Sequence, residues 1–119
     1  MSLMQRLMKS FRESPPTEIG GLAVAAVRDY KSLTITPVGG GPAKLEAPPA
    51  DMVILDLAEP GNYVAVRPSG TEPKVKFYFF SCLSPADSKD LVAAKARLRD
   101  RLAAYRSDIQ AYAKKVTAH

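Results

Sequence analysis

The stretch that decides the fold is residues 63–80, YVAVRPSGTEPKVKFYFF. Apolar and polar side chains alternate on both sides of a central segment rich in proline, serine and glycine, which is the pattern of two strands joined by a loop. In the first half, Val64 and Val66 share one face and Arg67 lies on the other. In the second half, Lys76 lies opposite an alternating apolar set. The stretch therefore predicts a β-hairpin with one buried face and with two cations on the other face.

The loop of this hairpin concentrates groups that bind an oxyanion. The guanidinium of Arg67 presents a planar fork of donors that matches two phosphate oxygens. Ser69 and Thr71 add hydroxyl groups, and Gly70 between them can turn consecutive amides toward an anion. Lys76 supplies a second cation near the loop. These residues alone leave two interpretations open, because a serine–glycine turn is often only a turn and an exposed arginine is often only solvated.

The complete string favours the first interpretation. The sequence R-P-S-G-T-E-P-K at residues 67–74, followed by V-K-F-Y, closely resembles the phosphate-binding loop of the α-D-phosphohexomutase superfamily, the phosphoglucomutases and phosphomannomutases. In that superfamily the loop lies in the fourth, C-terminal domain. The resemblance implies that Arg67 clamps a phosphate and that the hydroxyls of Ser69 and Thr71 donate hydrogen bonds to it. It also implies backbone donors from the amides of Gly70 and Thr71.

The resemblance shows as well what this sequence lacks. A chain of 119 residues makes one domain, whereas phosphohexomutases have four. The serine loop, the aspartate-rich metal loop and the sugar loop of the family are missing, so we expect Mg²⁺ and phosphoserine in the other domains of a parent enzyme and no cofactor here. Such a parent interconverts hexose 1-phosphate and hexose 6-phosphate. We expect the isolated chain to be inactive, and residues 1–3 could be a cloning scar.

Other segments predict further elements of the same domain. Apolar side chains at helical spacing between Met4 and Phe11 predict a short amphipathic helix, which the following prolines end. Residues 22–30 and residues 52–57 are apolar runs bounded by turn residues, and they predict two more strands. The segment 31–51 contains a glycine run and several prolines, which predicts a flexible surface loop with no more than a short strand.

The C-terminal part predicts one long helix over residues 84–117. Ser84 is its expected cap. An apolar stripe from Leu91 to Val116 follows the helix for about 30 residues, which corresponds to roughly 45 Å of helix length. A small sheet cannot cover such a stripe, so its distal half should pack on the N-terminal helix, on another domain or on a second copy. Together the elements give an α+β two-layer sandwich, with about four antiparallel strands and helices on one face. The family resemblance adds a TATA-binding-protein-like architecture.

The basic terminal helix suggests two alternatives to a phosphate-binding function. The formal net charge is +5, and most of it lies in the last helix, which would suit a basic nucleic-acid-binding module. We do not expect nucleic acid to bind, because the basic residues are spread around the helix and partly paired with acids at helical spacing. No aromatic strip of the RNA-recognition kind is visible either. Helix-mediated oligomerisation, as a homodimer through the terminal helix, stays open.

The amino-acid composition argues against several other classes of protein and of site. The chain is 46% hydrophobic and 24% charged, and no apolar run approaches the length that crosses a membrane. The single cysteine, Cys82, cannot form an internal disulfide and is expected to be buried and inert. One cysteine and one histidine argue against a zinc site. We therefore expect a cytoplasmic location, and we expect a phosphosugar and the other domains of the parent enzyme as partners.

Overall fold

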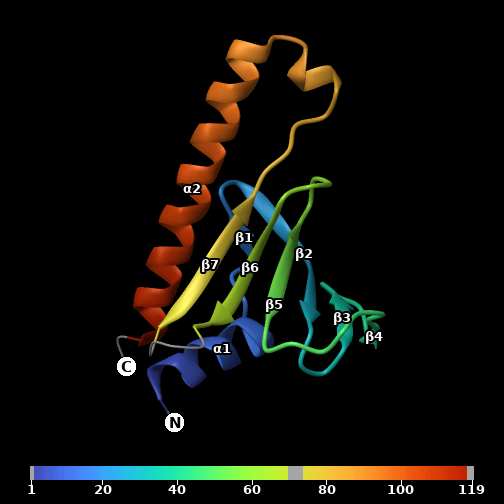
Figure 1. Ribbon diagram of the computed structural model, residues 1–119, viewed down its shortest axis with the longest axis vertical. Helices are drawn as coiled ribbons and strands as arrows, with labels where there is room; N and C mark the ends of the chain where they lie inside the picture. The colour runs from blue at the N-terminus through green and yellow to red at the C-terminus, as the bar shows by residue number, and fades with distance from the viewer. Residues whose placement is uncertain (1, 70–73, 118–119) are drawn as a thin grey trace.

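The computed structural model describes residues 2–69 and 74–117. One antiparallel sheet forms one layer and two helices lie against it (Figure 1), so the predicted α+β class is confirmed. In chain order the elements are α1 (Leu3–Glu13), β1 (Glu18–Ile19), β2 (Leu22–Asp29), β3 (Thr34–Pro37), β4 (Ala43–Lys44), β5 (Val53–Leu57), β6 (Tyr63–Pro68), β7 (Val75–Phe80), the short 3₁₀ turn η1 (Ala86–Ser88) and α2 (Leu91–Thr117).

The sheet is larger than the four strands expected. Its strand order is β4-β3-β2-β5-β6-β7, β1 pairs with β2, and every pairing is antiparallel. Within segment 31–51, β3 overlaps the short strand that the sequence allowed at residues 33–35, and β4 lies where glycine and proline predicted a loop; β1 is a further strand that was not expected. In β3, Thr34 pairs with Asp29 and Pro37 pairs with Ala26. The β-branched residues Thr34, Ile35 and Thr36 suit a strand, and pairing with β2 extends it as far as Pro37.

The hydrophobic core lies between the sheet and the helices. Alternate residues of β5 and β6 point into it, and all of them are 5% exposed or less: Val53, Leu55, Leu57, Val64 and Val66. From the helical layer, Phe11, Tyr105 and Ile109 are fully buried in the same cluster. The predicted core face of β6 is therefore confirmed, and this alternation leaves Arg67 on the opposite face.

The helix α1 begins with a capping box. The Ser2 hydroxyl accepts a hydrogen bond from the Gln5 amide, and the Gln5 side chain accepts one from the Ser2 amide. Ser2, one of the three residues that could be a cloning scar, therefore stabilises the start of α1. Leu7, Met8 and Phe11 form the buried stripe of the helix, as the helical spacing predicted.

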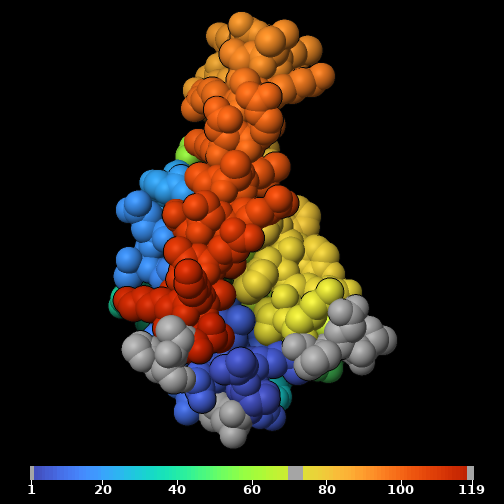
Figure 2. Space-filling model, turned by 90° about the vertical axis from the view of Figure 1, so that its left-hand side faces the viewer, coloured from blue at the N-terminus to red at the C-terminus, as the bar shows by residue number. Residues whose placement is uncertain are grey.

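The helix α2 is long and only partly covered. Its 27 residues span about 40 Å, close to the longest dimension of the molecule, 47 Å. The C-terminal half packs on α1, where the rings of Tyr112 and Phe11 lie 4.9 Å apart. Of the three partners that the sequence left open for the distal stripe, the structure shows the N-terminal helix. The N-terminal half rises above the sheet (Figures 1 and 2), and Leu91 and Val92 there are 70% and 81% exposed.

A close approach between α2 and the β1–β2 turn depends on Gly20. Its φ is +58°, and a Cβ at this position would lie 2.3 Å from a ring atom of Tyr105. The Gly20 amide also donates to a carboxylate oxygen of Asp108 at 2.7 Å. A side chain at this position would therefore displace α2 from the turn.

Two local expectations differ from the structure. The helix begins at Leu91 and not at Ser84, because Asp90 accepts from the amides of Val92 and Ala93 and so supplies the cap. The segment around Ser84 forms the 3₁₀ turn η1 instead. Cys82 is exposed rather than buried, because β7 ends at Phe80 and the chain leaves the sheet before the cysteine.

Candidate anion-binding site

The site starts from the register of β6 and β7. Arg67 pairs directly with Lys76, and the following pair is Pro68 with Val75. The Ser69 amide then donates to the carbonyl of Lys74 at 2.8 Å, which closes the base of the connecting loop. The hairpin predicted from the sequence is thus present, and it places two cationic side chains opposite each other on one face at its loop end.

Both cations are available to a ligand. The side chains of Arg67 and Lys76 are exposed, and within the described ranges neither has a hydrogen-bond or ion-pair partner. Like charges directly opposite on a sheet repel each other and destabilise the pair. Other arginines of the sheet and helices have carboxylate partners, such as Arg28 with Asp56 at 2.7 Å. The loop end therefore retains a positive charge that an anion could neutralise.

The remaining predicted site residues are placed only in part. Ser69 is buried, with 8% exposure, and has interactions of its own. Gly70 and Thr71 lie outside the described residues. Of the five predicted residues, the structure therefore brings together Arg67, Ser69 and Lys76 at one end of one hairpin.

A cavity of about 650 Å³ opens near the same end, on the helix side of Pro68. It is lined by α1 and the β2–β3 turn, and its arginine is already engaged. Arg12 donates to Asp29 at 3.2 Å and to Asp51 at 2.8 Å. Although the cavity is large, it lies on the face opposite to Arg67, and its paired arginine makes it a weaker anion site than the hairpin.

This ion-pair cluster shifts the pKa values of its members. Burial alone would raise the pKa of Asp29, but the amide of Lys31 and the guanidinium of Arg12 together hold it below its ordinary value. Burial likewise acts to lower the pKa of Arg12, and the hydrogen bonds and charges of Asp51 and Asp29 raise it overall. The ion pairs of this cluster therefore tie α1 to the end of β2 and to the segment before β5.

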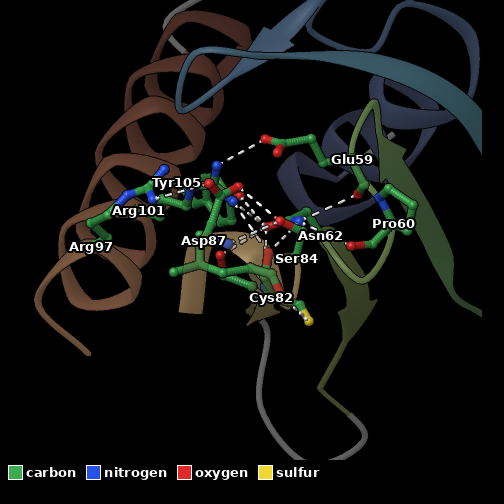
Figure 3. A network of polar contacts seen from close by, with 11 residues as sticks. Glu59, Pro60, Asn62, Cys82, Ser84, Asp87, Arg97, Arg101 and Tyr105 are labelled. Atoms are coloured by element: carbon green, nitrogen blue, oxygen red, sulfur yellow. Dashed lines mark hydrogen bonds and ion pairs between the residues drawn. The ribbon is translucent and has the colours of Figure 1, made fainter. Parts of the chain in front are cut away.

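A second polar cluster surrounds Asn62 at the other end of β6, and Figure 3 shows it. The Asn62 side chain is 1% exposed. Its amide nitrogen donates to the carbonyls of Glu59, Pro60 and Cys82, at 2.9 to 3.3 Å. Its oxygen accepts from the Tyr105 hydroxyl of α2 and from the Ser81 hydroxyl, both at 2.7 Å.

Arg101 of α2 completes this cluster. It donates to the Glu59 carboxylate at 2.8 Å and to the carbonyl of Cys82 at 3.2 Å. In Figure 3, Arg101 and Tyr105 reach from α2 toward the β5–β6 turn. Every polar atom of the Asn62 side chain is satisfied by protein groups, so this cluster fixes the helix to the sheet and offers no free group to a ligand.

Within residues 2–69 and 74–117, no group of three histidine, cysteine or carboxylate side chains could hold a metal ion. Nor is any helix described there long and apolar enough to cross a membrane.

The described residues form an α+β domain with two exposed cations, Arg67 and Lys76, at the loop end of its last two strands. Comparison with known proteins identifies the family. The family described as phosphoglucomutase/phosphomannomutase, C-terminal domain, matches residues 42–103, which is just over half of the 119 residues. The chain belongs to this family and corresponds to its C-terminal domain.

Individual relatives agree with the family match. The phosphoglucomutase of Staphylococcus epidermidis is 34% identical over 94 residues, which is 77% of this chain and 16% of that protein. The phosphoglucomutase of Staphylococcus aureus strain MRSA252 is 39% identical over 75 residues, 63% of this chain and 13% of that protein. The chain thus spans only a small part of the curated relatives that it matches. No solved structure matches it.

Proposed function

We propose that this chain is the substrate-phosphate-binding domain of a phosphohexomutase that interconverts hexose 1-phosphate and hexose 6-phosphate. The observation that supports the proposal is a pair of exposed cations on adjacent strands at the loop end of the hairpin, Arg67 and Lys76. Neither has a partner among residues 2–69 and 74–117. Ser69, Gly70 and Thr71 would add hydroxyl and amide donors, as the family motif implies. A phosphate at this position would remove the repulsion between the two cations.

The role proposed for the domain is binding and not chemistry. The phosphate that it holds is the one that is not transferred, and its binding energy positions the sugar for a reaction in other domains. A mutase must bind its substrate in two orientations. A phosphate group is therefore a suitable feature for the enzyme to recognise in both of them. Mg²⁺ and the phosphoserine belong to the other domains of the parent enzyme in this proposal, and those domains are its partners.

A phosphate titration of the chain tests this proposal. A few charge-assisted hydrogen bonds, offset by ordering and desolvation costs, give a dissociation constant of roughly millimolar. Arg67→Lys keeps the charge but loses the fork, so it should weaken binding, and Arg67→Ala should weaken it further. Arg106→Ala is the matched control, since it removes an exposed cation from α2. Equal affinities in Arg67→Ala and Arg106→Ala would contradict the proposal.

A second candidate role is pairing of α2 between two copies. The N-terminal half of α2 exposes apolar side chains at Leu91, Val92 and Leu102, and Leu98 lies on the same side of the helix. The spacing of Leu91, Leu98 and Leu102 alternates seven and four residues, as in a paired helix. Light scattering should then report a dimer that Leu98→Glu converts to a monomer. A monomeric mass in the unsubstituted chain would exclude this role.

A further inference from the structure

The sheet face that carries Arg67 also carries three aromatic rings, and the register of the two strands shows how they lie relative to one another. Tyr63, Tyr78 and Phe80 lie at positions that alternate with the core residues of β6 and β7, and therefore on the side away from both helices. Tyr78 and Phe80 are 40% and 42% exposed. The register unites residues that are distant in the sequence, because Tyr63 pairs with Phe80 and Ala65 pairs with Tyr78.

These groups are ordered along the hairpin. The cation pair of Arg67 and Lys76 lies next to the loop, the pair of Ala65 and Tyr78 follows, and the pair of Tyr63 and Phe80 comes last. Successive pairs on one face are about 6.8 Å apart along a strand. Tyr78 is thus the ring adjacent to the cations, because it follows Lys76 on the same face and lies diagonally opposite Arg67, at a distance that long side chains can bridge.

Tyr78 is also the uncommitted ring of the three. Tyr63 and Phe80 stack on each other at 4.5 Å, with an interplanar angle of 18°, and the guanidinium of Arg28 lies 5.6 Å from the Tyr63 ring. The same guanidinium holds both carboxylate oxygens of Asp56 at 2.7 Å. In the part of the chain that the structure describes, by contrast, Tyr78 has neither a stacked ring nor a partner for its hydroxyl.

The charges on this face favour an anionic ligand that also has an apolar surface. The carboxylate of Asp56 is neutralised by Arg28, whereas no carboxylate of the described residues pairs with Arg67 or Lys76. A phosphate held by these cations would place the group attached to it over the next pair, Ala65 and Tyr78. The small side chain of Ala65 leaves the tyrosine ring as the main contact there. A pyranose ring has an apolar face of C–H groups that suits an aromatic surface, and its hydroxyls can pair with a phenol.

We propose that Tyr78 is a sugar-binding residue that supports the pyranose ring of a hexose phosphate whose phosphate lies at Arg67 and Lys76. This inference rests on the proposed function and extends it from the phosphate to the sugar. It assigns the domain a share in recognising the ring as well as the anion. Burying about 40 Å² of the apolar ring face would tighten binding about fivefold.

Three probes separate the contributions of phosphate and sugar: inorganic phosphate, glycerol 3-phosphate, which lacks a ring, and glucose 6-phosphate. Their dissociation constants would be measured on the unsubstituted chain by amide chemical shifts. We expect glucose 6-phosphate to bind about fivefold more tightly than glycerol 3-phosphate. In Tyr78→Ala the two should bind equally, and in Tyr78→Phe most of the difference should remain. Phe80→Ala, the matched control one pair further from the cations, should leave the difference unchanged.

The outcomes distinguish this inference from the function on which it rests. If inorganic phosphate binds at Arg67 but the sugar adds no affinity, or if the added affinity survives in Tyr78→Ala, only the role of Tyr78 is wrong. If none of the three probes binds at Arg67, the phosphate-binding function and this inference are both wrong. Tyr78 is exposed and lies on the outermost strand of the sheet, so its substitution should leave the fold intact, and circular dichroism checks this.

Discussion

The two ends of strand β6 carry polar groups of opposite character. At the turn end, Asn62 is 1% exposed and each of its polar atoms is paired with protein groups from the turn, from residues 81–82 and from α2. At the loop end, Arg67 is exposed, faces Lys76, and has no partner among the described residues. The comparison separates polar groups that hold the fold together from polar groups that remain available to a ligand.

The largest expected effect concerns the turn end. Asn62→Ala removes the acceptor of the Tyr105 and Ser81 hydroxyls and the side-chain donor to three carbonyls, so we expect a loss of about 2–4 kcal/mol in the free energy of unfolding. Asn62→Asp is a second test, because it keeps the acceptor oxygen and replaces the donating amide with a charged oxygen that faces three carbonyls, so it should also be destabilising. Urea denaturation measures both variants. A loss below 0.5 kcal/mol, on the order of an ordinary surface change, would mean that the cluster is not structural.

A smaller effect is expected from acidification at the α1 cluster. The pKa of Asp29 is lowered in the folded state from the ordinary 3.8, so the unfolded chain takes up this proton first as the pH falls. The stabilisation is therefore complete above about pH 5 and is lost as the pH falls through the lowered pKa. Asp29→Asn should flatten this part of the stability curve. Parallel curves for both proteins between about pH 5 and pH 2 would contradict the assignment.

At the loop end, the expected effect on stability is small and has the opposite sign. Arg67→Ala removes a like charge facing Lys76, so without an anion the protein should be unchanged or more stable by a few tenths of a kcal/mol, roughly. Adding phosphate should raise the melting temperature of the unsubstituted chain and not that of Arg67→Ala. A clear destabilisation by Arg67→Ala would indicate that the arginine has a structural role.

We expect the isolated chain to have no catalytic activity. The loop end presents cations and no group that the family uses for phosphoryl transfer, so neither mutase nor phosphatase activity should appear, with or without Mg²⁺ and a hexose 1,6-bisphosphate activator. A coupled assay on purified protein checks this. Turnover that copurifies with the chain through several columns would overturn the division between binding here and chemistry elsewhere.

The hairpin, the core face and the class of fold could be predicted because the alternation in residues 63–80 is strong and local. The loop end was recognised from a contiguous string, so Arg67 and Lys76 were found before their geometry was known. The features that could not be predicted from the sequence are those that depend on pairing between distant segments. β4 forms because β3 provides an edge, and Tyr63 meets Phe80 only through the register.

The Asn62 cluster was missed for a related reason. An asparagine after proline and glycine is typical of a turn, and nothing local indicates that Tyr105 and Arg101, about forty residues later, will pair with that turn. The start of α2 was misplaced because both Ser84 and Asp90 are good caps, and only the structure shows that Asp90 has this role.

The central claim is that the loop end of the hairpin binds an anion while the turn end does not. Amide chemical shifts followed during a phosphate titration test it most directly. We predict saturable shifts concentrated at residues 67–76 and absent at residues 59–62, and we predict that they disappear in Arg67→Ala. Shifts that instead spread along the basic helix α2 and persist in Arg67→Ala would contradict the account, because the loop would then be only a turn.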